Sequence, residues 1–203
     1  MCTNCTIDDS SSGWANDEQL EDLHDQSFGG VIYLTGGSAT FERCTIRNSR
    51  GARGGVVSLM GGKIDFIDSN INTAAGMYGG VGSVSAGVLN FENCKIGQST
   101  AKAEGVVFRN TGGSIQLTSS NVTIPTCSGK RGWVYGSTAA SFLFSQVRLT
   151  GMEGNDCVLF KGDEASYAFA AGKCHFANAI VESLAIGALN IGRKMAVRIG
   201  SSR

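Results

Sequence analysis

The sequence predicts an all-β fold, a single-stranded right-handed parallel β-helix of about seven coils, each of about 25 residues, with a short helical insertion near the N-terminus. Three observations lead to this prediction. A motif of glycine and valine recurs at a fixed interval, apolar and polar residues alternate within each repeat, and equivalent positions of successive repeats share their chemistry. The motif occupies residues 29–32, 54–57, 79–82 and 104–107, at intervals of 25 residues.

Alternation within one repeat indicates strands and not helices. Ala39 and Phe41 alternate with Ser38 and Thr40, and comparable runs precede and follow them. Turn residues at 36–37 and 42–43 divide the repeat into three short strands, so the chain bends into a three-sided coil. The row that contains Phe41, Phe66 and Phe91 reaches Leu117 only after 26 residues, which places one inserted residue after the fourth motif. A right-handed coil is the default for parallel strand connections.

Stacking of one coil on the next predicts rows of equivalent residues about 4.8 Å apart. The first expected row is buried and consists of Phe41, Phe66, Phe91, Leu117, Phe144 and Phe169. The second expected row is also buried and consists of Ile46, Ile71, Ile96, Val122, Leu149 and Cys174. A small-residue corner row follows Cys44, Ser69, Cys94, Ser120, Val147 and Gly172, and a polar outward row follows Thr45, Asn70, Lys95, Asn121, Arg148 and Lys173.

Composition fits one elongated domain over residues 1–203 with a continuous core. We expect an insertion at 14–27, regular repeats over 29–122 and less regular coils over 123–203. The chain has 29 glycines and 1 proline, which suits many tight turns with few interrupted strand pairs. The net charge of +0 gives no argument for nucleic acid as a partner, and no apolar run is long enough for a membrane span.

The insertion is predicted to contain a short helix over residues 14–24, with Asn16 as its N-cap. This helix could cover the open first coil as a partial cap, or the acidic segment could be a docking loop. The chain opens halfway through a coil, because residues 1–7 align with residues 40–46. We therefore expect it to be a segment of a longer protein.

Seven cysteines raise the question of metal sites and disulfides. Cys2 and Cys5 form a CxxC pair with no second pair at zinc spacing, so no metal site is assigned. Cys44 and Cys94 lie two coils apart, roughly 9.6 Å, which is too far for a disulfide. Cys5 and Cys44 would be neighbours in one row, so a bridge there is open, although small buried fillers are the alternative.

Two sequons, at Asn4 and Asn121, are candidate glycosylation sites. A search for carboxylates stacked on neighbouring coils, as a polysaccharide-cleaving enzyme needs, finds none in register. Asp65 is flanked by Thr40 and Asn90 along its row, and Asp68 is expected to form an ion pair with Arg43. No catalytic residue, cofactor or cofactor-binding residue is assigned.

The Gly-Gly-Val-Ile motifs, together with Phe41-Glu42-Arg43-Cys44 and Phe91-Glu92-Asn93-Cys94, resemble the GGAI and FxxN repeats of polymorphic outer membrane proteins. Those repeats belong to the wider group of pectate-lyase-like right-handed β-helices. The resemblance covers about residues 29–122 and implies a surface-exposed adhesive or structural passenger.

The expected function is therefore that of a non-enzymatic structural or adhesive segment of a large extracellular or cell-surface protein. Expected partners are other segments of the same protein, neighbouring copies, or a glycan or other cell-surface ligand, with no nucleic acid and no membrane span. The alternatives are a carbohydrate-active enzyme, either a polysaccharide lyase or a hydrolase, and a carbohydrate-binding module. Two or more carboxylates within about 10 Å in one groove would favour the enzyme. A flat ice-binding face would need an outward threonine ladder, which the mixed row of Thr45, Asn70 and Lys95 does not supply.

Overall fold

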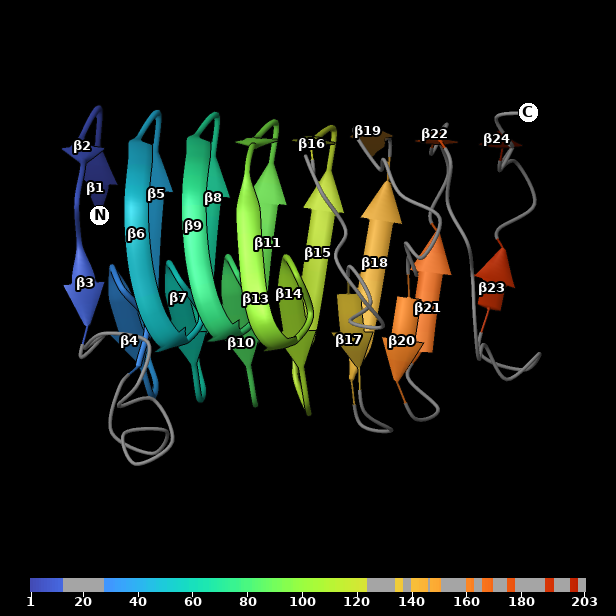
Figure 1. Ribbon diagram of the computed structural model, residues 1–203, viewed down its shortest axis with the longest axis horizontal. Coiled ribbons are helices and arrows are strands. Elements are labelled where there is room, and N and C mark those ends of the chain that lie inside the picture. Colours follow the sequence, from blue (N-terminus) through green and yellow to red (C-terminus); the bar gives the residue numbers. More distant parts are fainter. Residues whose placement is uncertain are drawn as a thin grey trace.

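The computed structural model shows a parallel β-helix built from three sheets (Figure 1). It describes residues 1–12, 28–123, 134–136, 140–145 and 147–150, followed by five strands between residues 160 and 200. Every strand pairing in the described part is parallel and joins one coil to the next. The predicted fold class is confirmed.

Each sheet collects strands from successive coils. Sheet A has eight strands: β1 (Cys2–Thr3), β5 (Ser38–Glu42), β8 (Lys63–Ile67), β11 (Val88–Glu92), β15 (Ser114–Thr118), β18 (Ser141–Ser145), β21 (Ser166–Phe169) and β23 (Leu189–Ile191). Sheet C has six: β4 (Ile32–Leu34), β7 (Val57–Leu59), β10 (Gly82–Val84), β14 (Phe108–Asn110), β17 (Val134–Gly136) and β20 (Phe160–Gly162). Sheet B is formed by β2 (Thr6–Ile7), β6 (Thr45–Arg53), β9 (Asn70–Tyr78), β12 (Lys95–Ile96), β16 (Asn121–Thr123), β19 (Arg148–Thr150), β22 (His175–Ala177) and β24 (Arg198–Gly200), with β3 (Ser11–Ser12) pairing β6 and β13 (Ser99–Glu104) pairing β9.

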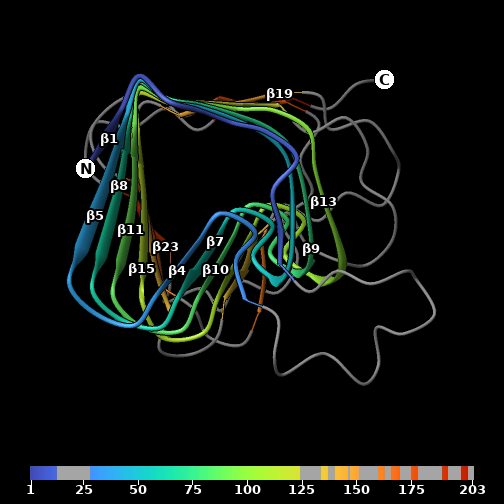
Figure 2. The same ribbon diagram turned by 90° about the vertical axis from the view of Figure 1, so that its left-hand side faces the viewer.

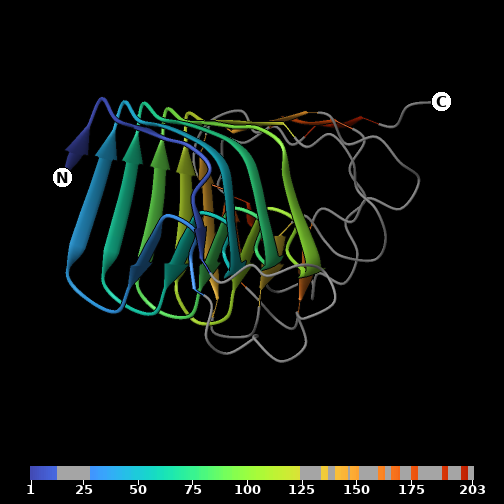
Figure 3. The same ribbon diagram turned by 60° about the vertical axis from the view of Figure 1, so that its left-hand side comes forward.

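The coil is right-handed, as Figure 2 shows: viewed from the N-terminal end, the chain runs clockwise from β4 through β5 and β6 to β7 as it recedes. Figure 3 shows the strands of each sheet following one another along the axis of the coil. Residues 29–123 make about four complete turns. The expected number was about seven, and beyond residue 123 the structure describes strands without complete turns.

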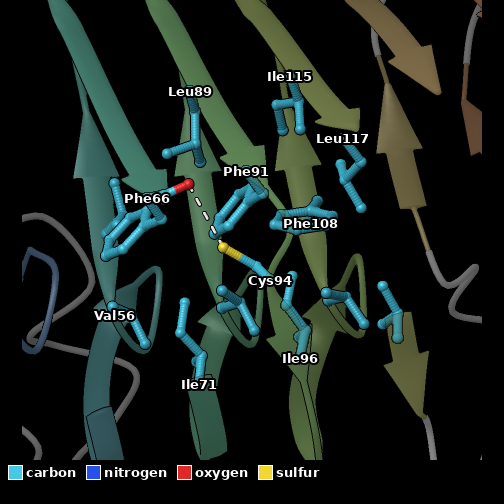
Figure 4. Close-up of a cluster of buried hydrophobic side chains, with 14 of the residues drawn as sticks. Val56, Phe66, Ile71, Leu89, Phe91, Cys94, Ile96, Phe108, Ile115 and Leu117 are labelled. Carbon is cyan, nitrogen blue, oxygen red and sulfur yellow. Dashed lines mark hydrogen bonds between the residues drawn. The ribbon is translucent and has the colours of Figure 1, made fainter. Parts of the chain in front are cut away.

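The buried rows of the core are confirmed over the described residues. Phe41, Phe66 and Phe91 pair in register, and their rings stack with centroids 4.9 Å and then 5.1 Å apart. Figure 4 shows this stack passing to Phe108, which enters the core from sheet C where Leu117 replaces a phenylalanine in sheet A. Gly82, the residue in register with Phe108 one coil earlier, leaves room for that ring.

The corner row is held by one repeated hydrogen-bond pattern. The hydroxyl of Ser69 accepts from the backbone N–H of Cys44 and donates to the carbonyls of Phe41 and Ile67. The thiol of Cys94 donates to the carbonyl of Phe66 at 3.3 Å (Figure 4), which is the same contact one coil later. A small side chain that donates to the equivalent carbonyls therefore fits from Cys44 to Ser120, which explains why serine and cysteine share these positions, while the next coil has the apolar Val147 in this row.

The position of the inserted residue in the fourth coil differs from the prediction. Gly82 pairs with Phe108 and not with Val107, so the extra residue precedes the motif. It lies in a β-bulge of β13, where the register shifts between Ala101 and Glu104. The physical reason is the backbone of Gly105, whose φ of +61° matches that of Gly79 and favours glycine. Gly105 is thus the first glycine of its motif and not the second.

The register after β21 also differs from the prediction. Leu149 pairs with Phe176 and not with Cys174, and Arg148 pairs with His175 and not with Lys173. His175 therefore follows Phe169 by two residues more than the repeat would give, and no sequence motif marks the change. Gly172 of the corner row and the helix predicted over residues 14–24 lie outside the described residues, and the described part contains no helix.

Candidate functional site

The outer face of sheet A carries a groove of about 270 Å³ across β8, β11 and β15. Alternation along these strands directs the apolar residues inward and leaves polar side chains on the outside. The groove is lined by the outward residues Lys63, Asp65, Ile67, Asn90, Glu92, Gln116 and Thr118, above the buried Phe66 and Phe91. The surface of the groove is mainly polar. The rings of Phe66 and Phe91 lie beneath it and face the core.

Asp65 is the most constrained side chain of the groove. One of its carboxylate oxygens accepts a hydrogen bond of 2.7 Å from the side-chain amide of Asn90, and the other lies 2.9 Å from the ammonium of Lys63. Both oxygens are thus engaged, and the Asp65 side chain is only 19% exposed. A carboxylate held in this way is a fixed structural anion and a poor general base.

Asn90 lies between Asp65 and Gln116 in the groove. Its amide nitrogen is used by Asp65, whereas its amide oxygen is buried and makes no hydrogen bond. Gln116 stands in register beside it on the next coil, but its amide donates to Ser114 at 3.4 Å. The Asn90 oxygen is therefore a buried acceptor that a rotated Gln116 amide could satisfy.

Glu92 brings a second, exposed carboxylate into the same groove. It stands two residues beyond Asn90 on β11, on a diagonal from Asp65 and outside its row. A search along rows therefore misses the pair, because the fixed repeat relates only residues at the same position. Two carboxylates in one groove are the arrangement that glycoside-cleaving enzymes use.

The ion pair expected between Arg43 and Asp68 is absent, and these two residues have other partners. Arg43 lies 3.1 Å from the carboxylate of Glu42 and donates to the side chain of Asn4 at 3.0 Å. Asp68 accepts a hydrogen bond of 2.6 Å from Asn93 on the following coil. Both residues adopt a left-handed backbone, with φ near +50°, and they bond in opposite directions along the axis: Arg43 to Asn4 on the coil before it and Asp68 to Asn93 on the coil after it.

Three cysteines meet at the corner of the first two coils. Cys2 and Cys5 form a disulfide, and the sulfur of Cys44 lies 2.6 Å from that of Cys5. Cys5 thus contacts both of its possible partners, and the bridge from Cys5 to Cys44 stays a prediction. Thiolates of three such cysteines would suit a soft cation such as Zn²⁺ or Cu⁺, and all three sulfurs lie within 4.8 Å of one another. Sulfurs joined in a disulfide are not thiolates, however, so the oxidised corner is not a metal site.

Cys94 is less reactive than the three cysteines at the corner of the first two coils. Its side chain is 1% exposed, and burial raises the pKa of its thiol from 9.0 to about 11. Because the thiolate is the reactive form, Cys94 stays protonated and inert near neutral pH. The structure therefore separates a packing cysteine from the three that meet at the corner.

The remaining predicted residues are placed as follows. Asn4 and Asn121 are both exposed, Asn4 in the turn between β1 and β2 and Asn121 at the start of β16. Glycosylation of either residue stays a prediction. Within the described residues, no helix is long and apolar enough to cross a membrane. No protein-family model matches the chain, and neither does any curated protein or solved structure.

Proposed function

We propose that the chain is a non-enzymatic structural or adhesive β-helix segment of a larger cell-surface or extracellular protein, and that the groove on sheet A is its contact surface. The engagement of both Asp65 oxygens is the observation that carries this proposal. A catalytic acid or base must exchange a proton with substrate, and Asp65 is instead neutralised by an ammonium and an amide. Amide and charged groups held in fixed positions suit the binding of a ligand better than proton transfer to it.

A glycan is the class of ligand that the groove suits best. Sugar hydroxyls both donate and accept hydrogen bonds, and the trough offers an ammonium, two carboxylates and two amides on three adjacent strands. The groove presents no exposed aromatic ring for stacking against a sugar. We therefore expect weak binding at a single site, which repeated copies on a surface would strengthen by multivalency.

Binding to oligosaccharides tests this proposal. Neutral and uronic-acid-containing oligosaccharides are titrated into the protein and followed by chemical-shift changes of the amides of β8, β11 and β15. Lys63→Ala should weaken binding at least several-fold, and Lys95→Ala, on the outward face of sheet B, serves as the matched control. Equal binding by both variants, or no shifts in the groove with any oligosaccharide, would count against an adhesive groove.

The second candidate is a polysaccharide lyase or hydrolase, because Asp65 and Glu92 share the groove. If the protein is such an enzyme, the exposed Glu92 would act as the general acid or base, and Asp65 would provide a fixed negative charge. The same oligosaccharides are incubated with the protein and analysed for new reducing ends or unsaturated products. Cleavage that Glu92→Gln abolishes would replace the adhesive proposal with the enzymatic one.

A further inference from the structure

The first coil departs from the others at one position of its core row. Cys2 pairs in register with Phe41, so it stands where Phe41, Phe66 and Phe91 stand in the following coils. Cys5 likewise precedes Cys44 in the corner row, because Thr6 pairs with Thr45. The cysteine side chain that replaces the aromatic ring places its sulfur within 4.8 Å of the two sulfurs of the corner.

The Cα separations of both possible pairings of Cys5 suit a disulfide. The Cα atoms of Cys2 and Cys5 are 6.4 Å apart. Those of Cys5 and Cys44 belong to neighbouring coils, which are spaced by about 4.8 Å. Both values lie within the range of about 4.4 to 6.8 Å that disulfides span. The sulfurs of Cys5 and Cys44 are in contact, 2.6 Å apart, and all three sulfurs of the corner lie within 4.8 Å of one another.

We propose that Cys2, Cys5 and Cys44 form a thiol–disulfide exchange centre that moves the disulfide of Cys5 between a partner in its own coil and a partner in the next coil. The thiolate of Cys44 attacks the sulfur of Cys5, the Cys5–Cys44 bond forms, and the Cys2–Cys5 bond breaks. The electron pair of the broken bond stays on the sulfur of Cys2, which then takes up the proton that Cys44 released. Nothing is oxidised or reduced overall, so the step needs no outside reagent.

The exchange changes what the disulfide does for the fold. The Cys2–Cys5 bond closes a separation of 3 residues within one turn. The Cys5–Cys44 bond closes a separation of 39 residues and ties the first coil to the second. That coil is otherwise held by the short strands β1, β2 and β3 and by single backbone contacts, such as the hydrogen bond from Asn4 to Glu42 and that from Thr45 to Cys5. The second pairing should therefore suppress opening of the coil.

Peptide mapping under non-reducing conditions tests the exchange. The protein is acid-trapped, its free thiols are alkylated, and the disulfide-linked peptides are identified by mass spectrometry. The wild type should give both the Cys2–Cys5 and the Cys5–Cys44 linkages, with alkylation divided between Cys44 and Cys2. Cys44→Ser should retain only the first linkage and Cys2→Ser only the second. Serine already occupies the corner row at Ser69 and Ser120, so Cys44→Ser should fold.

Hydrogen exchange supplies a second measurement. The amides of Asn4 and Thr45 should exchange more slowly in Cys2→Ser, where the coils are tied together, than in Cys44→Ser. Cys94→Ser, a buried cysteine of the same row, is the matched control and should leave the linkages unchanged. A single linkage in the wild type, pairing of Cys44 with a cysteine outside this corner, or three free thiols retaining a metal ion would each overturn the proposal.

Discussion

The two faces of the same strands in sheet A behave differently. On the inner face, Phe41, Phe66 and Phe91 repeat one residue type and stack in register. On the outer face, Lys63 and Asp65 of β8 are followed one coil later by Val88 and Asn90, so little repeats. The core requires the same shape at every level of the solenoid, whereas solvent imposes no such demand. The regular face therefore specifies the fold, and the irregular face is where recognition can be placed.

Truncation of the phenylalanine stack should give the largest effect. Phe66→Ala removes a fully buried ring between two others, which should lower the free energy of unfolding by about 3 to 5 kcal/mol. Phe66→Leu is the control, since Leu117 occupies the same row, and should cost about 1.5 kcal/mol or less. Denaturant unfolding measures both values. A loss below 1 kcal/mol, on the order of a surface change, would show that the stack does not organise the fold.

The backbone turns show the same contrast between packed and open positions. Gly54 has φ +79°, and an added Cβ would meet the carbonyl of Val57, whereas Gly36 has nothing within 4 Å. Gly54→Ala should therefore lower the free energy of unfolding by at least about 2 kcal/mol, and Gly36→Ala should change it by about 0.5 kcal/mol or less. Thermal unfolding of the two variants side by side checks the prediction. Equal stability would contradict the close approach of the Val57 carbonyl to Gly54.

The sequence predicted the inner face well because packing repeats with the coil. The rows of Phe66 and Ile71 follow from period and alternation alone. The position of the bulge before Gly105 was predicted wrongly because it depends on the positive φ angle of Gly105. Aligning repeats by residue type gives no information about backbone angles. The groove was missed for a related reason. Asp65 and Glu92 are related by a diagonal across two strands, and a repeat of fixed length contains no information about diagonals between residues that do not repeat.

Raising the pH should test the corner row. Burial raises the pKa of Cys94 to about 11 from 9.0, so folding favours the protonated thiol. This contribution is fully present below pH 9 and is lost as the pH rises toward 11. The wild type should lose roughly 2 kcal/mol more than Cys94→Ser between pH 8 and about 11, because each pKa unit corresponds to about 1.4 kcal/mol.

Cys94→Ser is a suitable reference for this titration because Ser69 and Ser120 make the same corner contacts. Lysine and tyrosine residues titrate equally in both proteins, so their contributions cancel in the difference. The free energies are taken from urea unfolding at each pH. Parallel curves for the two proteins would mean that the Cys94 thiol is not desolvated in the folded state.

The smallest change in the free energy of unfolding is expected at Lys63, on the outer face of β8, three residues before Phe66. Lys63 is half exposed and pairs with Asp65, and Ser38 occupies its position one coil earlier. Lys63→Ser should change the free energy of unfolding by about 0.5 kcal/mol or less, because exposed ion pairs contribute little after screening and side-chain ordering. Urea unfolding at low and high salt measures this change, with Phe66→Leu on the same strand for scale. A loss above roughly 2 kcal/mol would mean that the groove helps to hold the coils together, and the division between a fold-specifying inner face and a ligand-binding outer face would then fail.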